Sequence, residues 1–268
     1  MLDHRVRMKE TLDSSGAREE NLVSYSSFGI SVIDDLLGGG LLTGDNYLLE
    51  IEPGTEEMSF VSSFLEAGWQ QQESCVVVTY DLPHEELIRR LEEYVGAKGK
   101  LSSGSLSILD LWTEAKNDYQ MKGPIFMVDK PGDINAMTRM FLELADQIPQ
   151  RAQTWKFKGI RLVTYSVSSM VINYKLEPSY KWMRRGLELA RRLNITTLGI
   201  LNSKMFDETV VATLEHYHDG IIALSMKELD DRFQRFVTIK KSPIPGFSTL
   251  KVPYSIEGGK PRLQKQPD

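Results

Sequence analysis

The chain has 268 residues, 41% of them hydrophobic, and a formal net charge of −5. This hydrophobic content is enough for a sizeable core and excludes a globally disordered chain. The acidic balance argues against a protein that grips phosphate backbones over a wide surface, although a local basic patch stays open. The single cysteine, Cys75, permits no intrachain disulfide, and its apolar neighbours predict a buried residue.

No apolar stretch approaches the ~20 residues that a membrane helix needs, and the first residues lack the apolar segment of a signal peptide. We therefore expect a cytoplasmic protein without membrane contact. Residues 1–27 are polar and predict an N-terminal arm. Residues 28–263 predict a single domain, and residues 264–268 a polar tail.

The hydrophobic pattern alternates between strand and helix along most of the chain. We predict helices over 30–37, 58–70, 85–94, 137–148 and 178–193, and strands over 45–51, 76–80, 106–111, 125–128, 160–167 and 196–201. Three further strands, 221–226, 233–239 and 249–256, follow with no predicted helix between them. The alternation predicts an α/β fold with a mostly parallel sheet flanked by helices, and the last three strands predict an antiparallel edge.

The turn between the strand over 45–51 and the helix over 58–70 is placed like a phosphate-binding loop. Such a loop needs glycines whose N–H groups wrap phosphate, a lysine for the β- and γ-phosphates and a Ser or Thr for Mg²⁺. The sequence from Glu50 to Ser59 reads EIEPGTEEMS and does not match this pattern by itself.

The neighbouring segments resemble the KaiC-like and RadA/RecA-like ATPases. Residues 28–45, FGISVIDDLLGGGLLTGD, resemble the family's lead-in "TGIxxLDxLLGGGIxxG", with Gly29, Asp34 and Gly44 in register. Residues 78–90 resemble the family segment "VSFEExxEEL", and residues 191–198 and 219–222 also look like the family. The resemblance covers about residues 28–263 and implies the RecA-like P-loop NTPase fold.

Aligned with the family's "GPPGTGKT", the loop of this chain is degenerate. Pro53, Gly54 and Thr55 are kept, whereas Ile51 and Glu56 replace glycines, Glu57 replaces the lysine, and Met58, followed by Ser59, replaces the magnesium-binding Ser/Thr. Two carboxylates thus stand where a triphosphate needs a cation. A purely structural alternative is that Glu56 and Glu57 favour the positive end of the helix.

Other positions of the resemblance point the same way. The family's catalytic acid matches Asp81, which a helix cap would explain equally well, and Tyr165 replaces a magnesium-associated Asp. Lys240 matches the lysine of the family's "LKMRG" segment, whereas Ser242 replaces its arginine. Asp81 and Lys240 are therefore interpreted as catalytic relics.

Two other stretches contain clustered charged or metal-ligating residue types. The stretch from Lys181 to Arg192 is basic and is interpreted as a solvated helix face, with a docking surface for an acidic partner or nucleic acid as the alternative. The run His216-Tyr217-His218-Asp219 is better explained by a helix end before a strand than by a metal site. His84 lies close to Asp81 in sequence, and no metal site is predicted.

Three functions remain open from the sequence. The first is a non-catalytic, pseudo-ATPase relative of KaiC that acts as a regulatory, scaffold or adaptor subunit with a protein partner, an active paralogue or further copies of itself. It would need no cofactor. The second is an ATPase with a remodelled pocket that binds ATP and magnesium. The third is a recombinase-like DNA-binding protein, which the acidic charge disfavours.

Overall fold

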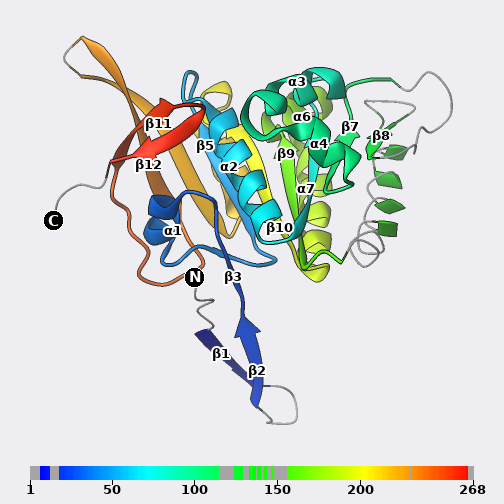
Figure 1. The fold of residues 1–268 in the computed structure, drawn as a ribbon, viewed down its shortest axis with the longest axis horizontal. Coiled ribbons are helices and arrows are strands. Elements are labelled where there is room, and N and C mark those ends of the chain that lie inside the picture. Colours follow the sequence, from blue (N-terminus) through cyan, green and yellow to red (C-terminus); the bar gives the residue numbers. More distant parts are fainter. Residues whose placement is uncertain are drawn as a thin grey trace.

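The computed structural model describes residues 7–12, 18–114, 124–128, 156–229 and 231–264, together with scattered residues between 133 and 147. Its centre is a ten-stranded sheet in the order β14-β13-β12-β11-β5-β10-β9-β6-β7-β8 (Figure 1). The parallel part contains β5 (Asn46–Ile51), β6 (Glu73–Thr79), β7 (Leu106–Asp110), β8 (Ile125–Met127), β9 (Gly159–Tyr165), β10 (Ile195–Asn202) and β11 (Gly220–Leu229).

The C-terminal strands pair antiparallel at one edge of this sheet. β11 pairs with β12 (Arg232–Lys241), β12 with β13 (Val252–Glu257) and β13 with β14 (Lys260–Leu263). The prediction of a mostly parallel sheet with an antiparallel C-terminal edge is confirmed. The β11–β12 hairpin extends beyond the body of the sheet (Figure 1).

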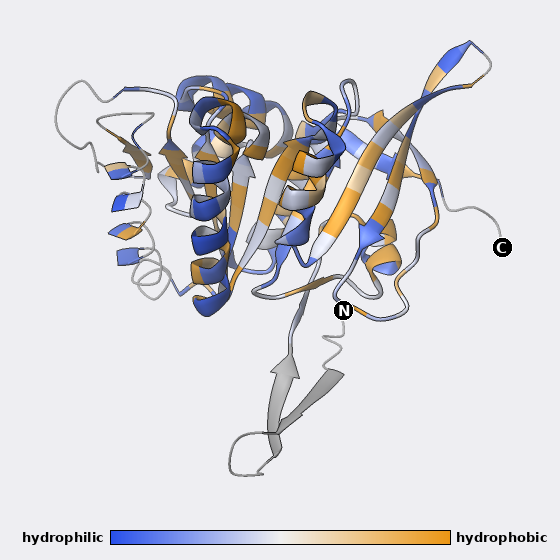
Figure 2. Cartoon of the chain, turned by 180° about the vertical axis from the view of Figure 1, so that it is seen from behind, coloured by the Kyte–Doolittle hydropathy of each residue, from blue (hydrophilic) through white to orange (hydrophobic). Residues whose placement is uncertain are grey.

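Helices cover both faces of the sheet, because alternate residues of each parallel strand point to opposite sides. On one face, Val77 belongs to a core with residues of α1 (Ser31–Leu37), α2 (Glu57–Gln70), α3 (His84–Val95) and α4 (Ala97–Ser102). On the other face, Val78 belongs to a core with residues of α6 (Val167–Tyr174), α7 (Leu176–Arg192) and α8 (Glu208–His216). Figure 2 shows the orange, hydrophobic strands beneath helices whose outward faces are mostly blue.

Two short strand pairs lie near α1 in the sequence. The first pair precedes α1, and the strands of the second pair lie on either side of it. β1 (Arg7–Leu12) and β2 (Arg18–Val23) pair antiparallel, and β3 (Tyr25–Ser26) pairs with β4 (Leu41–Leu42). Gly29 lies against α2, and a Cβ at this position would stand 2.2 Å from the Ser63 carbonyl oxygen. With its φ of +101°, this close approach explains why a glycine occurs at the start of the segment that resembles the family lead-in.

Several predicted boundaries were wrong. The strand predicted over 160–167 ends at Tyr165, and the apolar residues after it form α6, because an apolar run alone does not distinguish a strand from a buried helix. α4 and α8 were not predicted, and β14 occurs in a stretch too polar to suggest a strand. The helix predicted over 137–148 falls largely outside the described residues. Within the described part of the chain, no helix is long and apolar enough to cross a membrane.

Candidate functional site

The loop between β5 and α2 lies at the carboxyl edge of the parallel sheet, where α/β proteins place their ligand sites. Pro53 and Gly54 are exposed, and Thr55 is fully buried. Glu56, directly before α2, has φ of 59° and ψ of 48°. This left-handed conformation suits glycine, and a residue with a side chain adopts it at a cost of about 1 kcal/mol.

Side chains of the loop, of α2 and of β13 donate hydrogen bonds to the carbonyl groups of the loop. The Thr55 hydroxyl donates to the Glu52 carbonyl at 2.7 Å, and the Ser59 hydroxyl donates to the Glu56 carbonyl at 2.7 Å. From the antiparallel edge, Tyr254 donates its hydroxyl to the Thr55 carbonyl at 2.7 Å. These hydrogen bonds occupy the carbonyl groups of Glu52, Thr55 and Glu56.

The β11–β12 hairpin also contacts this loop. Arg235 on β12 donates from Nε to the Gly54 carbonyl at 2.8 Å, and its Nη2 lies 3.4 Å from a Glu56 carboxylate oxygen. Met226 on β11 packs so closely that its sulfur would stand 2.7 Å from a Cβ at Gly54. Met58, in turn, is buried in the core rather than directed at the loop. Sequence reasoning missed Arg235, Tyr254 and Met226.

Acidic groups gather around the first turn of α2. Glu57 accepts a hydrogen bond from the Tyr165 hydroxyl at 3.1 Å, and burial together with the Glu57 charge raises the pKa of Tyr165. The carboxylate of Glu52 accepts from the Met226 backbone N–H at 2.9 Å and lies 3.1 Å from the Lys204 ammonium. Burial would raise the pKa of Glu52, but these two contacts lower it on balance.

Asp81 and Lys240 lie in different surroundings. Asp81 follows β6 and interacts electrostatically with Glu57 in the first turn of α2. Lys240 lies on β12, where its ammonium donates to the Glu50 carboxylate at 2.7 Å and to the Glu215 carboxylate. The contacts of Lys240 therefore lie with β5 and α8, apart from the acidic neighbours of Asp81.

Replacing Asp81 by asparagine is expected to stabilise the fold at neutral pH. Burial raises the pKa of the Asp81 carboxyl, and the charge of Glu57 raises it further, against the hydrogen bond to Ser166. A pKa above the unfolded value means that the ionised carboxyl destabilises the folded state, and that this penalty fades as the pH falls below the raised pKa. The urea midpoint of Asp81→Asn should thus exceed that of the parent at neutral pH, and the difference should shrink in acid.

Urea titrations of both chains at neutral pH and near pH ~4, close to the ordinary pKa of a carboxyl group, check this result. The exposed Glu188→Gln provides the matched control, because this substitution also removes one carboxylate but from a solvated helix face. A gain that does not change between the two pH values would contradict the assigned cause.

The fold and the position of this loop define a RecA-like P-loop protein. The family described as "ATPase: KaiC" matches residues 26–262, and the chain belongs to this family. Relatives include the UPF0273 protein MK0039 of Methanopyrus kandleri, 24% identical over 87% of this chain and 89% of that protein. A UPF0273 protein of Thermotoga maritima is also 24% identical, over 85% of this chain and 90% of the relative.

Solved structures show the same fold. The KaiC-like protein PH0186 of Pyrococcus horikoshii has a TM-score of 0.65 at 21% identity, covering 91% of this chain and all of that one. The uncharacterized protein PH0321 of the same organism was solved in complex with an unknown peptide. It has a TM-score of 0.75 at 12% identity, and the match covers 90% of this chain and all of the PH0321 chain. The RecA-like fold expected from the sequence is thereby confirmed.

Proposed function

We propose that this KaiC-family chain does not hydrolyse ATP and acts as a cytoplasmic regulatory, scaffold or adaptor subunit. The observation that carries the proposal is the pair Glu56 and Glu57 at the start of α2, where a phosphate loop needs a bare backbone and a lysine. The chain would retain the fold because its sheet edges and helices still bind other proteins, which is an argument from analogy.

The electrostatics around the loop support this proposal. Two like charges about 4 Å apart repel by ~4 kcal/mol at an effective dielectric constant near 20, whereas a helix N-terminus attracts an anion by only ~1 kcal/mol. Arg235 pairs with Glu56 at 3.4 Å, but it also donates to the Gly54 carbonyl. A triphosphate would therefore meet a net acidic loop.

The contacts of the loop carbonyls give independent support. A phosphate loop must turn several N–H groups toward its ligand, and any rearrangement here would disturb the hydrogen bonds from Arg235, Tyr254 and Thr55. On both grounds the residues present do not fit ATP with magnesium.

An ATPase with a remodelled pocket is the second candidate. Membership of a family of ATPases favours it, and Asp81 remains beside the first turn of α2, where a general base for an attacking water would be useful. In that function Asp81 and Lys240 would be the surviving catalytic residues. DNA binding by the basic side of α7 is a weaker third possibility, since Lys181 pairs with Glu177 and Arg191 with Asp219.

A protein partner fits the exposed tip of the β11–β12 hairpin. At the end of the β11–β12 hairpin, Phe233 is 69% exposed and Leu229 is 45% exposed, although a few exposed apolar residues are common on protein surfaces. PH0321, which has the same fold, was solved with an unknown peptide. We therefore propose a protein as the ligand, either an active paralogue, another partner or a second copy of this chain.

Calorimetric titration with ATP and magnesium tests the proposal. We expect no saturable heat from the unmodified chain at micromolar nucleotide, and no phosphate release in a coupled assay. Micromolar ATP binding would overturn the non-catalytic function and favour the remodelled ATPase. Salt-sensitive binding to DNA in the absence of nucleotide would instead favour the third candidate.

A further inference from the structure

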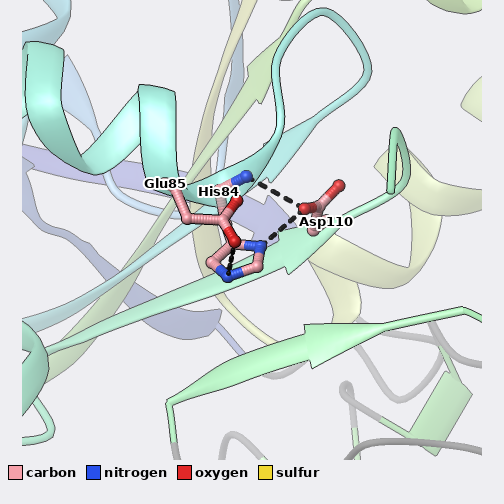
Figure 3. Close-up of side chains that lie close together, drawn as sticks. All are labelled: His84, Glu85 and Asp110. Carbon is pink, nitrogen blue, oxygen red and sulfur yellow. Dashed lines mark hydrogen bonds and ion pairs between the residues drawn. The ribbon is translucent and has the colours of Figure 1, made fainter. Parts of the chain in front are cut away.

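A histidine and a buried aspartate meet at the start of α3. His84 is the first residue of α3, and Asp110 is the last residue of β7. The fully buried Asp110 carboxylate accepts two hydrogen bonds from His84 through one oxygen, at 2.9 Å from the backbone N–H and at 2.8 Å from the ring Nδ1 (Figure 3).

The second carboxylate oxygen of Asp110 also accepts two hydrogen bonds. It accepts the backbone N–H groups of Trp112 and Thr113, each at 2.8 Å. Asp110 accepts backbone N–H groups on both of its oxygens, so it acts as an acceptor and Nδ1 of His84 is the donor. When the ring carries a single proton, that proton is on Nδ1 and the lone pair is on Nε2.

Nε2 of His84 points at the carboxylate of Glu85 (Figure 3). The distance from Nε2 to Oε1 is 3.3 Å. Two lone pairs that face each other at this distance repel unless a cation, either a proton or a metal ion, lies between them. Within the described part of the chain, His84, Glu85 and Asp110 are also the three potential ligands whose donor atoms lie within 4.8 Å of one another.

We propose that Nε2 of His84 and the carboxylate of Glu85 bind a transition-metal ion of the zinc class, with Asp110 as the positioning residue behind the imidazole. A metal-binding histidine ordinarily donates its other ring N–H to a carboxylate or carbonyl, which fixes the tautomer. Asp110 does this here, and its other hydrogen bonds keep it out of direct coordination.

The chemistry of the two ligands selects the metal. An imidazole nitrogen favours Zn²⁺, Ni²⁺ and Cu²⁺, whereas Mg²⁺ and Ca²⁺ prefer oxygen ligands alone. The positive end of α3 opposes a cation by ~0.3–1 kcal/mol, and the charges of Glu85 and Asp110 act against this. With two direct protein ligands and water at the remaining positions, the site would bind its metal weakly and exchangeably.

Titration of an untagged chain with Zn²⁺ alone, up to millimolar concentration, tests the site. The sequence has four histidines, so each can be checked. We expect one saturable zinc event that weakens by about tenfold or more in His84→Gln and to a smaller extent in Glu85→Gln. Glu85 is 71% exposed in its side chain, so its substitution should leave the fold unchanged.

His216→Gln is the matched control, because it removes an exposed histidine from the run His216-Tyr217-His218-Asp219, the other candidate ligand group in the sequence. Imidazole ¹⁵N spectra provide a second measurement: they should show Nδ1 protonated and should show Nε2 shift when zinc is added. The absence of a saturable event, equal binding by Mg²⁺, or an unchanged affinity in His84→Gln would each overturn the proposal and leave His84 and Glu85 as a simple ion pair.

Discussion

The combined substitution Glu56→Gly, Glu57→Lys and Met58→Thr is expected to give the chain measurable affinity for ATP with magnesium. Replacing a negative charge by a positive one near a phosphate changes the interaction by several kcal/mol, because each pair at 4 Å contributes ~4 kcal/mol at an effective dielectric constant near 20. A gain of about a thousandfold in affinity corresponds to ~4 kcal/mol. Calorimetric titration against the unmodified chain measures it.

The structure indicates what each substitution does to the fold. Glu56→Gly relieves the left-handed backbone at this position. Glu57→Lys removes the acceptor of the Tyr165 hydroxyl, and a lysine can donate to that hydroxyl instead. Met58→Thr shortens a buried side chain of the core, at a cost of about 1–3 kcal/mol. The urea midpoint of the variant must therefore be measured beside its affinity.

The double substitution Glu56→Gln and Glu57→Gln serves as the control, because it removes both negative charges without supplying a cation. It should bind ATP much more weakly than the triple variant. A folded triple variant with no affinity at all would contradict side-chain repulsion as the main obstacle. The hydrogen bond from Arg235 to the Gly54 carbonyl would then be the next candidate for the obstacle to nucleotide binding. Adding Arg235→Ala to the triple variant would test it.

Most of the helices and strands of the parallel part of the sheet could be predicted from the local sequence. Strands such as β6 and β10 are continuous apolar runs, and parallel strands covered on both faces have that pattern. The departure of residues 51–58 from the phosphate-loop pattern could also be read from the sequence, since these residues are contiguous. Both inferences depend only on residues that are close together in the sequence. The α6 helix was missed because it continues the apolar run of β9 without a break.

What closes the loop could not be predicted from the sequence. Arg235 and Tyr254 contact residues 54–56 from positions about 180 and 199 residues away, and only the order of strands in the sheet brings them there. The same holds for His84 and Asp110, which meet because β6 and β7 are neighbours. The sequence alone suggested Asp81 as the neighbour of His84. Asp81 instead interacts with Glu57 and Ser166.

A buried ion pair between residues far apart in the sequence could not be predicted either. Arg161 occurs within the apolar run of β9, where the pattern predicts only a strand. Its side chain is fully buried and forms an ion pair with Glu73 on β6. It also donates to the carbonyls of Ser27 at 2.9 Å and Phe64 at 2.8 Å, and to the Ser26 hydroxyl. One guanidinium thus joins the sheet, α2 and the segment before α1.

Replacing Arg161 by methionine is accordingly expected to destabilise the fold by about 3–5 kcal/mol, the range for removing one partner of a buried pair. The loss comes chiefly from leaving Glu73 buried with its charge unpaired and two carbonyls without their donor. The guanidinium also stacks over the Phe64 ring at 4.7 Å from its centroid. The urea midpoint, read at constant slope, measures the change.

Arg89→Met is the matched control, because Arg89 pairs with Glu86 and Glu93 on the exposed face of α3 and is itself 60% exposed. Exposed pairs contribute about 0.2–1 kcal/mol, so this variant should lie close to the parent. Adding Glu73→Leu to Arg161→Met removes the unpaired charge and should recover part of the loss. Equal losses in the two arginine variants would mean that Arg161 is not the central connection between the sheet, α2 and the N-terminal segment.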